Sequence, residues 1–211
     1  MPELRPYEIA DKTIISLNRR AIRRFEAGRR RLSVMGFDEL SVISEIKSIY
    51  EGLDEDNRKA FRQLFIDQYK EMSGEQIDSI EEIAEMYLGN LLETPHPLTH
   101  YVYETEVVRK RDRTAEAVNA VDGQADKDYE LKKGLSFWSQ MTAWYVDAVS
   151  DGATLEAFKA MGIKYVQWHT SPDDSVCADC RALDGVVFEI DNIPDKPHLN
   201  CRCYLTPVKR R

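Results

Sequence analysis

All four cysteines of this 211-residue chain lie within its last 35 residues, in two close pairs. Two residues separate the first pair and one residue separates the second, and a histidine precedes the second pair. Zinc prefers thiolate sulfur and imidazole nitrogen as ligands, and structural zinc sites close with four of them. The spacing therefore predicts a structural zinc site, which draws its ligands from Cys177, Cys180, His198, Cys201 and Cys203.

Five side chains compete for four positions, and the sequence leaves the choice open. An all-cysteine site would leave His198 free, whereas a site with His198 would leave Cys201 or Cys203 free. Pro197 stiffens the approach of His198, and the step from His198 to Cys201 repeats the spacing of the first cysteine pair. Against this, thiolates are soft ligands that suit zinc well.

Other uses of these cysteines are a disulfide, a redox pair, or plain burial as small apolar side chains. A redox CxxC opens a helix after a strand, whereas here we expect a strand to follow Cys180. A zinc deaminase would need a proline before the CxxC, but Val176 stands there. His169 is also followed by no glutamate at the required place. These departures favour a closed, structural site.

Composition indicates a folded chain with a wet surface, with 43% apolar and 31% charged residues. No stretch approaches the roughly 20 apolar residues of a membrane span, and the N-terminal residues form no apolar signal core. We therefore expect no membrane contact, and a cytosolic setting in which thiols stay reduced.

The net charge of −8 hides a basic segment, since residues 12–31 carry +7 and the remainder −15. This segment is predicted to be a helix that meets nucleic acid or an acidic partner. Arginines four residues apart stack like charges on one face, which predicts that some other group neutralises them. The candidate contact residues are Arg19, Arg20, Arg23, Arg24, Arg29, Arg30 and Arg31.

Helical periodicity dominates the first 160 residues. An aromatic stripe within 126–150 is predicted to be core rather than a base-stacking surface. The predicted helices span about 8–31, 39–51, 55–72, 75–93, 99–121, 126–150 and 152–160, with Asp54 as the N-cap of the helix at 55–72.

After Gly162 the pattern changes to short strands, predicted at 163–169, 186–190 and 204–206. Three strands of this size bury too little surface to be stable alone. The predicted fold is a mainly α-helical body, residues 1–161, and a small C-terminal α+β module, residues 162–211, whose antiparallel strands are stapled by the zinc site.

Several segments of the tail together resemble the C-terminal domain of phage Mu F-type minor head proteins, the head morphogenesis family. The family pattern is a tryptophan-bearing strand, a D-x-x-V-C-x-x-C segment, an Asp-Gly turn and a closing H-x-N-C-R-C. The resemblance covers about 162–208, while residues 1–95 show no motif that can be assigned. The matching segments are Trp168 to Asp173, Val176 to Cys180, Leu183 to Gly185 and Pro197 to Pro207.

The resemblance implies a few-copy capsid component near the portal vertex, which supports procapsid assembly and DNA retention or ejection. Its partners would be portal and capsid proteins, and DNA through the basic helix. It would lie in the host cytoplasm during assembly and then in the virion. The family's cysteines and histidine fall on the five ligand candidates named above.

Two other classes of function remain. One is a zinc-stapled nucleic-acid-binding protein outside a virion, and the other is a toxin-like or hydrolytic enzyme. The chain has no convergent set of acid, base and nucleophile, and His96 and His100 are weak candidates that flank Pro97 in a loop. We therefore expect no enzymatic activity, no catalytic residue and no small-molecule substrate.

Overall fold

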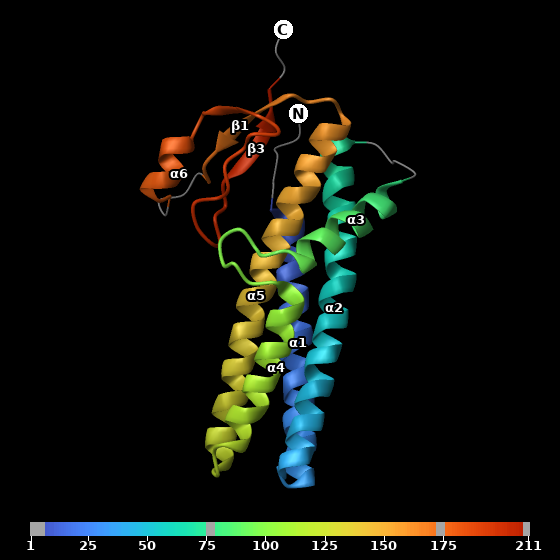
Figure 1. Ribbon diagram of the computed structural model, residues 1–211, viewed down its shortest axis with the longest axis vertical. Coiled ribbons are helices and arrows are strands. Elements are labelled where there is room, and N and C mark those ends of the chain that lie inside the picture. The colour runs from blue at the N-terminus through green and yellow to red at the C-terminus, as the bar shows by residue number, and fades with distance from the viewer. Residues whose placement is uncertain (1–6, 75–78, 172–175, 209–211) are drawn as a thin grey trace.

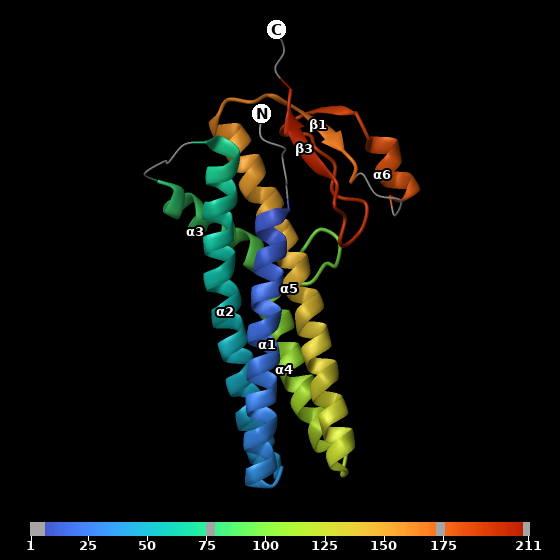
Figure 2. The same ribbon diagram turned by 180° about the vertical axis from the view of Figure 1, so that it is seen from behind.

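The computed structural model describes residues 7–74, 79–171 and 176–208 (Figure 1). Long helices run side by side along the molecule, and a small sheet with one short helix sits at one end of them (Figures 1 and 2). The predicted class, a mostly helical chain with a C-terminal antiparallel sheet, is confirmed. The elements in chain order are α1 (Glu8–Met35), α2 (Glu39–Ser73), α3 (Ile80–Glu93), α4 (Tyr103–Asn119), α5 (Gln124–Ala160), β1 (Tyr165–His169), α6 (Ala178–Leu183), β2 (Val187–Glu189) and β3 (Tyr204–Pro207).

Large aromatic side chains fill the centre of the helical body. Trp138 and Tyr145 of α5 are each 1% exposed, which confirms that the aromatic stripe is core. Tyr50 meets Trp138 edge-on at 5.6 Å between ring centroids, and Phe61 stacks on Tyr145 at 6.4 Å. Burial of rings of this size is the main stabilising contribution to such a bundle.

Two predicted helix breaks do not exist. The predicted helices 39–51 and 55–72 are one helix, α2, and Asp54 bonds to Arg58 one turn later instead of capping a new helix. The predicted helices 126–150 and 152–160 are likewise one helix, α5. Gly152 lies inside α5, and the ring of Tyr87 occupies the place where a β-carbon would be. Glycine is therefore required there for close packing and does not end the helix.

Two other helix starts shift. α4 begins at Tyr103 rather than at residue 99, because the preceding residues form a turn in which His100 has a φ of 58°. The predicted start of a helix at 75 lies outside the described residues, and α3 begins at Ile80. None of the described helices combines the length and the apolar character needed to cross a membrane.

The sheet has the order β2-β1-β3 with antiparallel pairing on both sides of β1. Val166 lies opposite Phe188, and Trp168 lies opposite Leu205. Val166 and Trp168 are buried at alternate positions, so one face of β1 turns inward. The three strands were predicted: the first two with bounds one or two residues wider than β1 and β2, and the third one residue shorter than β3.

The short helix α6 was not predicted. We expected a strand to follow Cys180, but residues 178–183 are helical and Cys177 is the N-cap. The sulfur of Cys177 accepts a hydrogen bond from the backbone N–H of Cys180 at 3.4 Å. The spacing of the pair therefore serves the cap of a helix as well as the approach of two sulfurs.

Candidate metal centre

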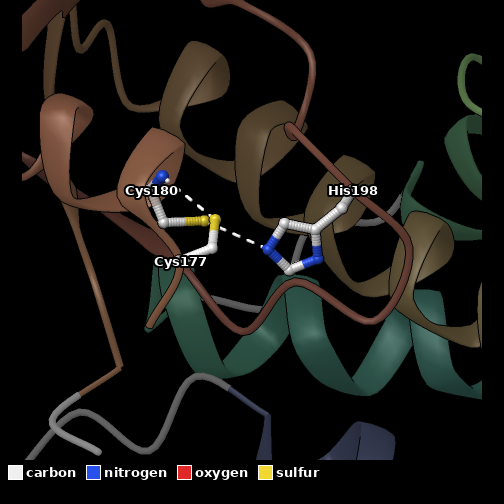
Figure 3. A group of neighbouring side chains, drawn as sticks. All are labelled: Cys177, Cys180 and His198. Atoms are coloured by element: carbon white, nitrogen blue, oxygen red, sulfur yellow. Dashed lines mark hydrogen bonds between the residues drawn. The ribbon is translucent and has the colours of Figure 1, made fainter. Parts of the chain in front are cut away.

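The candidate ligands come from two segments that the sheet brings together. Cys177 and Cys180 sit at the start of α6, and His198 lies in the loop that leads to β3. Cys201 and Cys203 follow in the last residues before β3. Figure 3 shows the Cys177 and Cys180 sulfurs and the His198 ring directed toward one another.

Cys180 is the centre of the cluster. Its Sγ lies 3.3 Å from Nε2 of His198 and 3.5 Å from Sγ of Cys201. Two groups have ligand atoms within 4.8 Å of one another, and Cys180 belongs to both. The first group adds Cys177 and His198, and the second adds Cys201 and Cys203. The Cys/His cluster can therefore hold a metal ion.

His198 presents the ring nitrogen that a metal needs. Its Nδ1 lies 2.9 Å from the carbonyl oxygen of Leu199, which can only accept a hydrogen bond. The proton of a neutral ring therefore belongs on Nδ1, which leaves the lone pair of Nε2 facing Cys180. A hydrogen bond from the second ring nitrogen is the usual way in which a ligating histidine is oriented.

All four cysteines are free thiols. Burial raises the pKa of the Cys180 and Cys201 thiols, because a charged thiolate is poorly solvated there. The pKa of Cys177 is lowered instead, because the backbone N–H of Cys180 donates to its sulfur. A bound cation would displace the protons of the buried thiols and compensate the negative charge of the thiolates. The site therefore suits a metal ion better than it suits unpaired thiolates.

Little apolar surface supports this cluster. Its buried members are Trp168, Cys180, Cys201 and Cys203. The Nε1 of Trp168 is buried without a hydrogen-bond partner among the described residues. Such a cluster contributes far less burial than the aromatic centre of the helical body.

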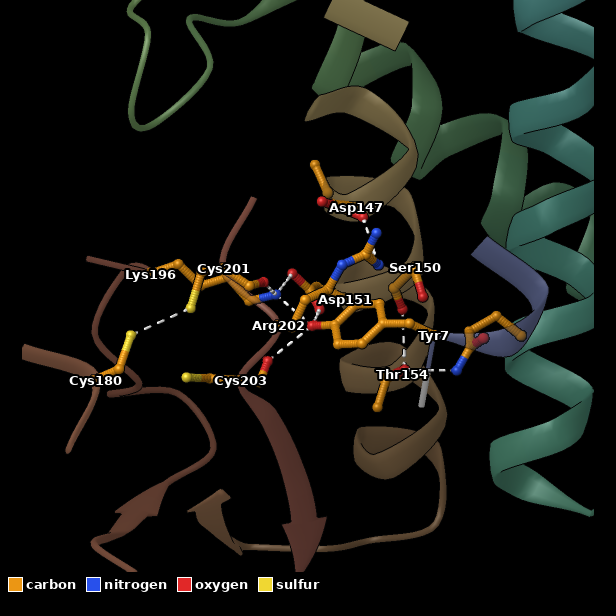
Figure 4. Close-up of polar contacts among 12 residues, drawn as sticks. Tyr7, Asp147, Ser150, Asp151, Thr154, Cys180, Lys196, Cys201, Arg202 and Cys203 are labelled. Carbon is orange, nitrogen blue, oxygen red and sulfur yellow. Dashed lines mark hydrogen bonds and ion pairs between the residues drawn. The ribbon is translucent and has the colours of Figure 1, made fainter. Parts of the chain in front are cut away.

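Several polar contacts join the segment that contains Cys201 and Cys203 to the helical body (Figure 4). Tyr7 Oη lies 2.7 Å from the carbonyl oxygen of Cys203 and 2.8 Å from the carboxylate of Asp151. Lys196 Nζ donates to the carbonyl oxygen of Cys201 at 3.1 Å and pairs with Asp151 at 2.6 Å. Burial raises the pKa of Tyr7 well above its usual value, so its hydroxyl keeps its proton. The backbone of both cysteines is thus held by α5 and by the start of α1.

Arg202, between the two cysteines, reaches the same helices. Its guanidinium lies 2.9 Å from Asp11 of α1 and 3.3 Å from Asp147 of α5. Burial raises the pKa of Asp147 to about 6, although Arg202 and Lys196 oppose this. Sequence reasoning missed these contacts, because Tyr7 and Cys203 are 196 residues apart and no local pattern links them.

A cavity of about 380 Å³ adjoins the cluster, between α5, the loop that contains His96 and the loop that contains His198. His96 is 6% exposed, and burial lowers its pKa. Its Nδ1 accepts the backbone N–H groups of Leu98 and Thr99, and its ring meets Tyr145 edge-on. His96 therefore holds the turn before α4, while His100 is exposed.

Most of the basic segment is already paired within the chain. Arg20 and Arg24 both contact Asp56 of α2, which supplies the neutralising group that the sequence called for. The other pairs join Arg29 to Asp128, Arg30 to Glu26 and Arg31 to Glu45. Of the seven arginines, Arg19 and Arg23 have no ion pair within the described part of the chain.

Comparison with known families identifies the region that contains this centre. Residues 140–206 match the family described as Phage Mu protein F like protein. The chain thus carries a Phage Mu protein F-like domain over these residues, which confirms the resemblance expected from the cysteine motifs. The match begins inside α5, so it takes in Asp147 and Asp151 as well as the five candidate ligands. No curated protein and no solved structure gives a significant match.

Proposed function

We propose that this chain is a structural minor head protein of a phage, which acts in head assembly through portal and capsid proteins. The observation that carries the proposal is the match to a Phage Mu protein F-like domain over the segment that contains all five metal-ligand candidates. The protein would lie in the host cytoplasm during assembly and then in the virion, near the portal. The domain bounds predicted above, 1–161 and 162–211, are part of this proposal.

The metal that fits the centre is zinc, because the donors are thiols and an imidazole. We assign the ligands as Cys177, Cys180, His198 and Cys201. The orientation of His198 and the 3.5 Å separation of Cys180 and Cys201 support this set. Zinc would act as a cross-link between the start of α6 and the loop before β3.

The assignment is tested by comparing His198→Ala with Cys203→Ser. Loss of a ligand should weaken zinc binding by more than the roughly 10–100-fold that loss of an outer-shell partner costs. Competition with a chromophoric chelator measures this: His198→Ala should lose affinity, and Cys203→Ser should stay near the wild-type value. The opposite ranking would support the all-cysteine set instead.

A structural role is favoured over catalysis by the number of protein donors. A catalytic zinc keeps a position open for water or substrate, whereas here five protein donors lie in two groups that share Cys180, which is more than the four that close a structural site. The ion would thus be closed to substrate. The function proposed is assembly, without enzymatic activity.

A protein partner also fits the basic helix better than DNA does. Affinity for DNA grows with the number of phosphates that Lys and Arg neutralise. Five of the seven arginines here already pair with carboxylates of the same chain, so few are free for phosphate. DNA binding by the isolated chain should therefore be weak, which a gel-shift titration in salt would measure.

The proposal is tested by co-expression with the portal and coat proteins of the same phage. The tagged chain should recover portal protein and enter assembled heads. Cys177→Ser/Cys180→Ser should enter less well, with Cys203→Ser as the matched control. A chain that is missing from heads and binds neither protein would overturn the assignment.

A further inference from the structure

The outer face of α1 carries a strip in which cations and apolar side chains alternate. We call Lys12, Ile15, Arg19, Ile22 and Arg23 the basic strip. Steps of three and four residues place all five on one face of the helix. Ile15 is 51% exposed and Ile22 is 42% exposed. Lys12 pairs with Glu8 at 2.7 Å, whereas neither arginine has an ion pair among the described residues.

The opposite sign of charge gathers at the far end of the bundle, in a groove between the start of α2 and the turn that joins α4 to α5. We call the residues Glu39, Ile43, Asp112, Glu116 and Asp122 the acidic groove. Asp112 pairs with Arg111 at 2.7 Å, whereas Glu39, Glu116 and Asp122 have no ion pair in the described part of the chain. Ile43, 45% exposed, adds apolar surface to the groove.

One cation, Lys127, also lines this groove. Its Nζ already donates to the carbonyl oxygen of Val118 at 2.9 Å and lies over the ring of Phe37. It therefore serves the turn itself, and the outward charge of the groove remains negative.

The two surfaces cannot meet within one molecule. The strip lies on the first half of α1, toward the sheet, and the groove lies at the opposite end of the long helices (Figure 2). At 1.5 Å per residue the middle of the strip is roughly 25 Å from the end of α1. Any contact between strip and groove must therefore join two molecules.

We propose that the basic strip of one copy docks in the acidic groove of a second copy. Both surfaces combine exposed apolar area with charge, and the charges are opposite, which is how an amphipathic helix binds in a groove. Phosphate offers no apolar surface against which the two isoleucines could be buried, so a protein surface fits the strip better. The contact is independent of the metal and of the assignment as a head protein.

The two surfaces differ, so the contact is head-to-tail. Each copy that uses its strip leaves its groove free, and the assembly grows into a ring or an open row rather than stopping at a symmetric dimer. This predicts a distribution of oligomers whose size rises with concentration and falls with salt.

Sedimentation velocity of the full chain at low and high salt tests the proposal. Arg19→Glu/Arg23→Glu reverses the strip, and Glu116→Lys/Asp122→Lys reverses the groove. Each variant alone should show an apparent dissociation constant raised at least about tenfold, because like charges now face each other. Mixed one to one, the two variants should associate again, because each supplies the surface that complements the other.

Lys132→Glu/Lys164→Glu makes the same change in net charge as the strip variant, but outside both surfaces, so it should associate like the wild type. Circular dichroism establishes that every variant is folded. A wild-type chain that stays monomeric at all concentrations overturns the proposal, and so does a mixture of folded variants that fails to associate. If the strip variant instead loses affinity for DNA while the wild type is monomeric, nucleic acid is the occupant and the proposal is wrong.

Discussion

The helical body and the C-terminal module are stabilised in different ways. The body buries large side chains from all its long helices, among them Tyr50, Phe61, Trp138 and Tyr145. The module buries one tryptophan and three cysteines in a cluster of its own. Because stabilisation by burial grows with the apolar area removed from water, packing contributes more to the body than to the module.

The two regions differ in which interactions keep them folded. The body depends on close packing, which spreads stability over many residues. The module has fewer such points: the Cys/His cluster and the polar contacts that Tyr7, Lys196 and Arg202 make between it and the helices. A single change at those points should therefore matter more than one in a larger core.

The largest effect is expected from Cys177→Ser/Cys180→Ser. It removes the sulfur shared by both groups of donors, so the metal should be lost and residues 176–208 should lose protection together. Hydrogen exchange should show this loss while α1, α2 and α5 keep their protection. Cys203→Ser is the matched control. If the module of the double variant were as protected as that of the wild type, the cluster would not be what keeps the module folded.

A large effect confined to the helical body is expected from Trp138→Ala. Removing a buried indole leaves a cavity and should lower the unfolding free energy by about 3–5 kcal/mol. Urea denaturation followed by circular dichroism measures this change, with Met86→Ala, at a position 73% exposed, as the control. Zinc affinity of the folded variant should be unchanged, and a parallel loss of zinc would mean that the regions fold as one unit.

The smallest effect lies at the contact between the regions. Burial raises the pKa of Asp147 to about 6, so between roughly pH 4 and 6 the folded chain binds more protons than the unfolded chain. The contribution of Asp147 to the unfolding free energy therefore falls as the pH rises through this window, by on the order of 2–3 kcal/mol.

Asp147→Asn should remove that dependence, since the amide does not titrate. Urea denaturation of both proteins at pH 4.5 and pH 7 measures the difference. The variant should gain stability relative to the wild type at the higher pH. An identical pH dependence in the two proteins would show that Arg202 compensates fully for the burial of Asp147.

The sequence predicted the elements whose signal is local. Helical periodicity gave the body, and the cysteine spacing gave the cluster, because both are set by residues a few positions apart. The break expected at Asp54 was wrong, because a residue that can cap a helix can also pair with Arg58 inside one. The break expected after residue 150 was wrong because α5 continues past Gly152, which packs against Tyr87.

The rest depended on contacts that join distant parts of the chain. Nothing near Tyr7 indicates that its hydroxyl meets the backbone of Cys203, and nothing near Asp56 indicates that it neutralises Arg20 and Arg24. Helix α6 was missed for another reason, since six residues are too few for a periodic signal. Such contacts follow from the packing of the whole chain and not from any segment of it.

We propose that one metal ion holds the C-terminal module together, and native mass spectrometry of the purified full chain would detect that ion. We expect one zinc per chain, and we expect a strong chelator to remove both the zinc and the protection of residues 176–208 from hydrogen exchange. A metal-free chain whose module is still protected from exchange would contradict it.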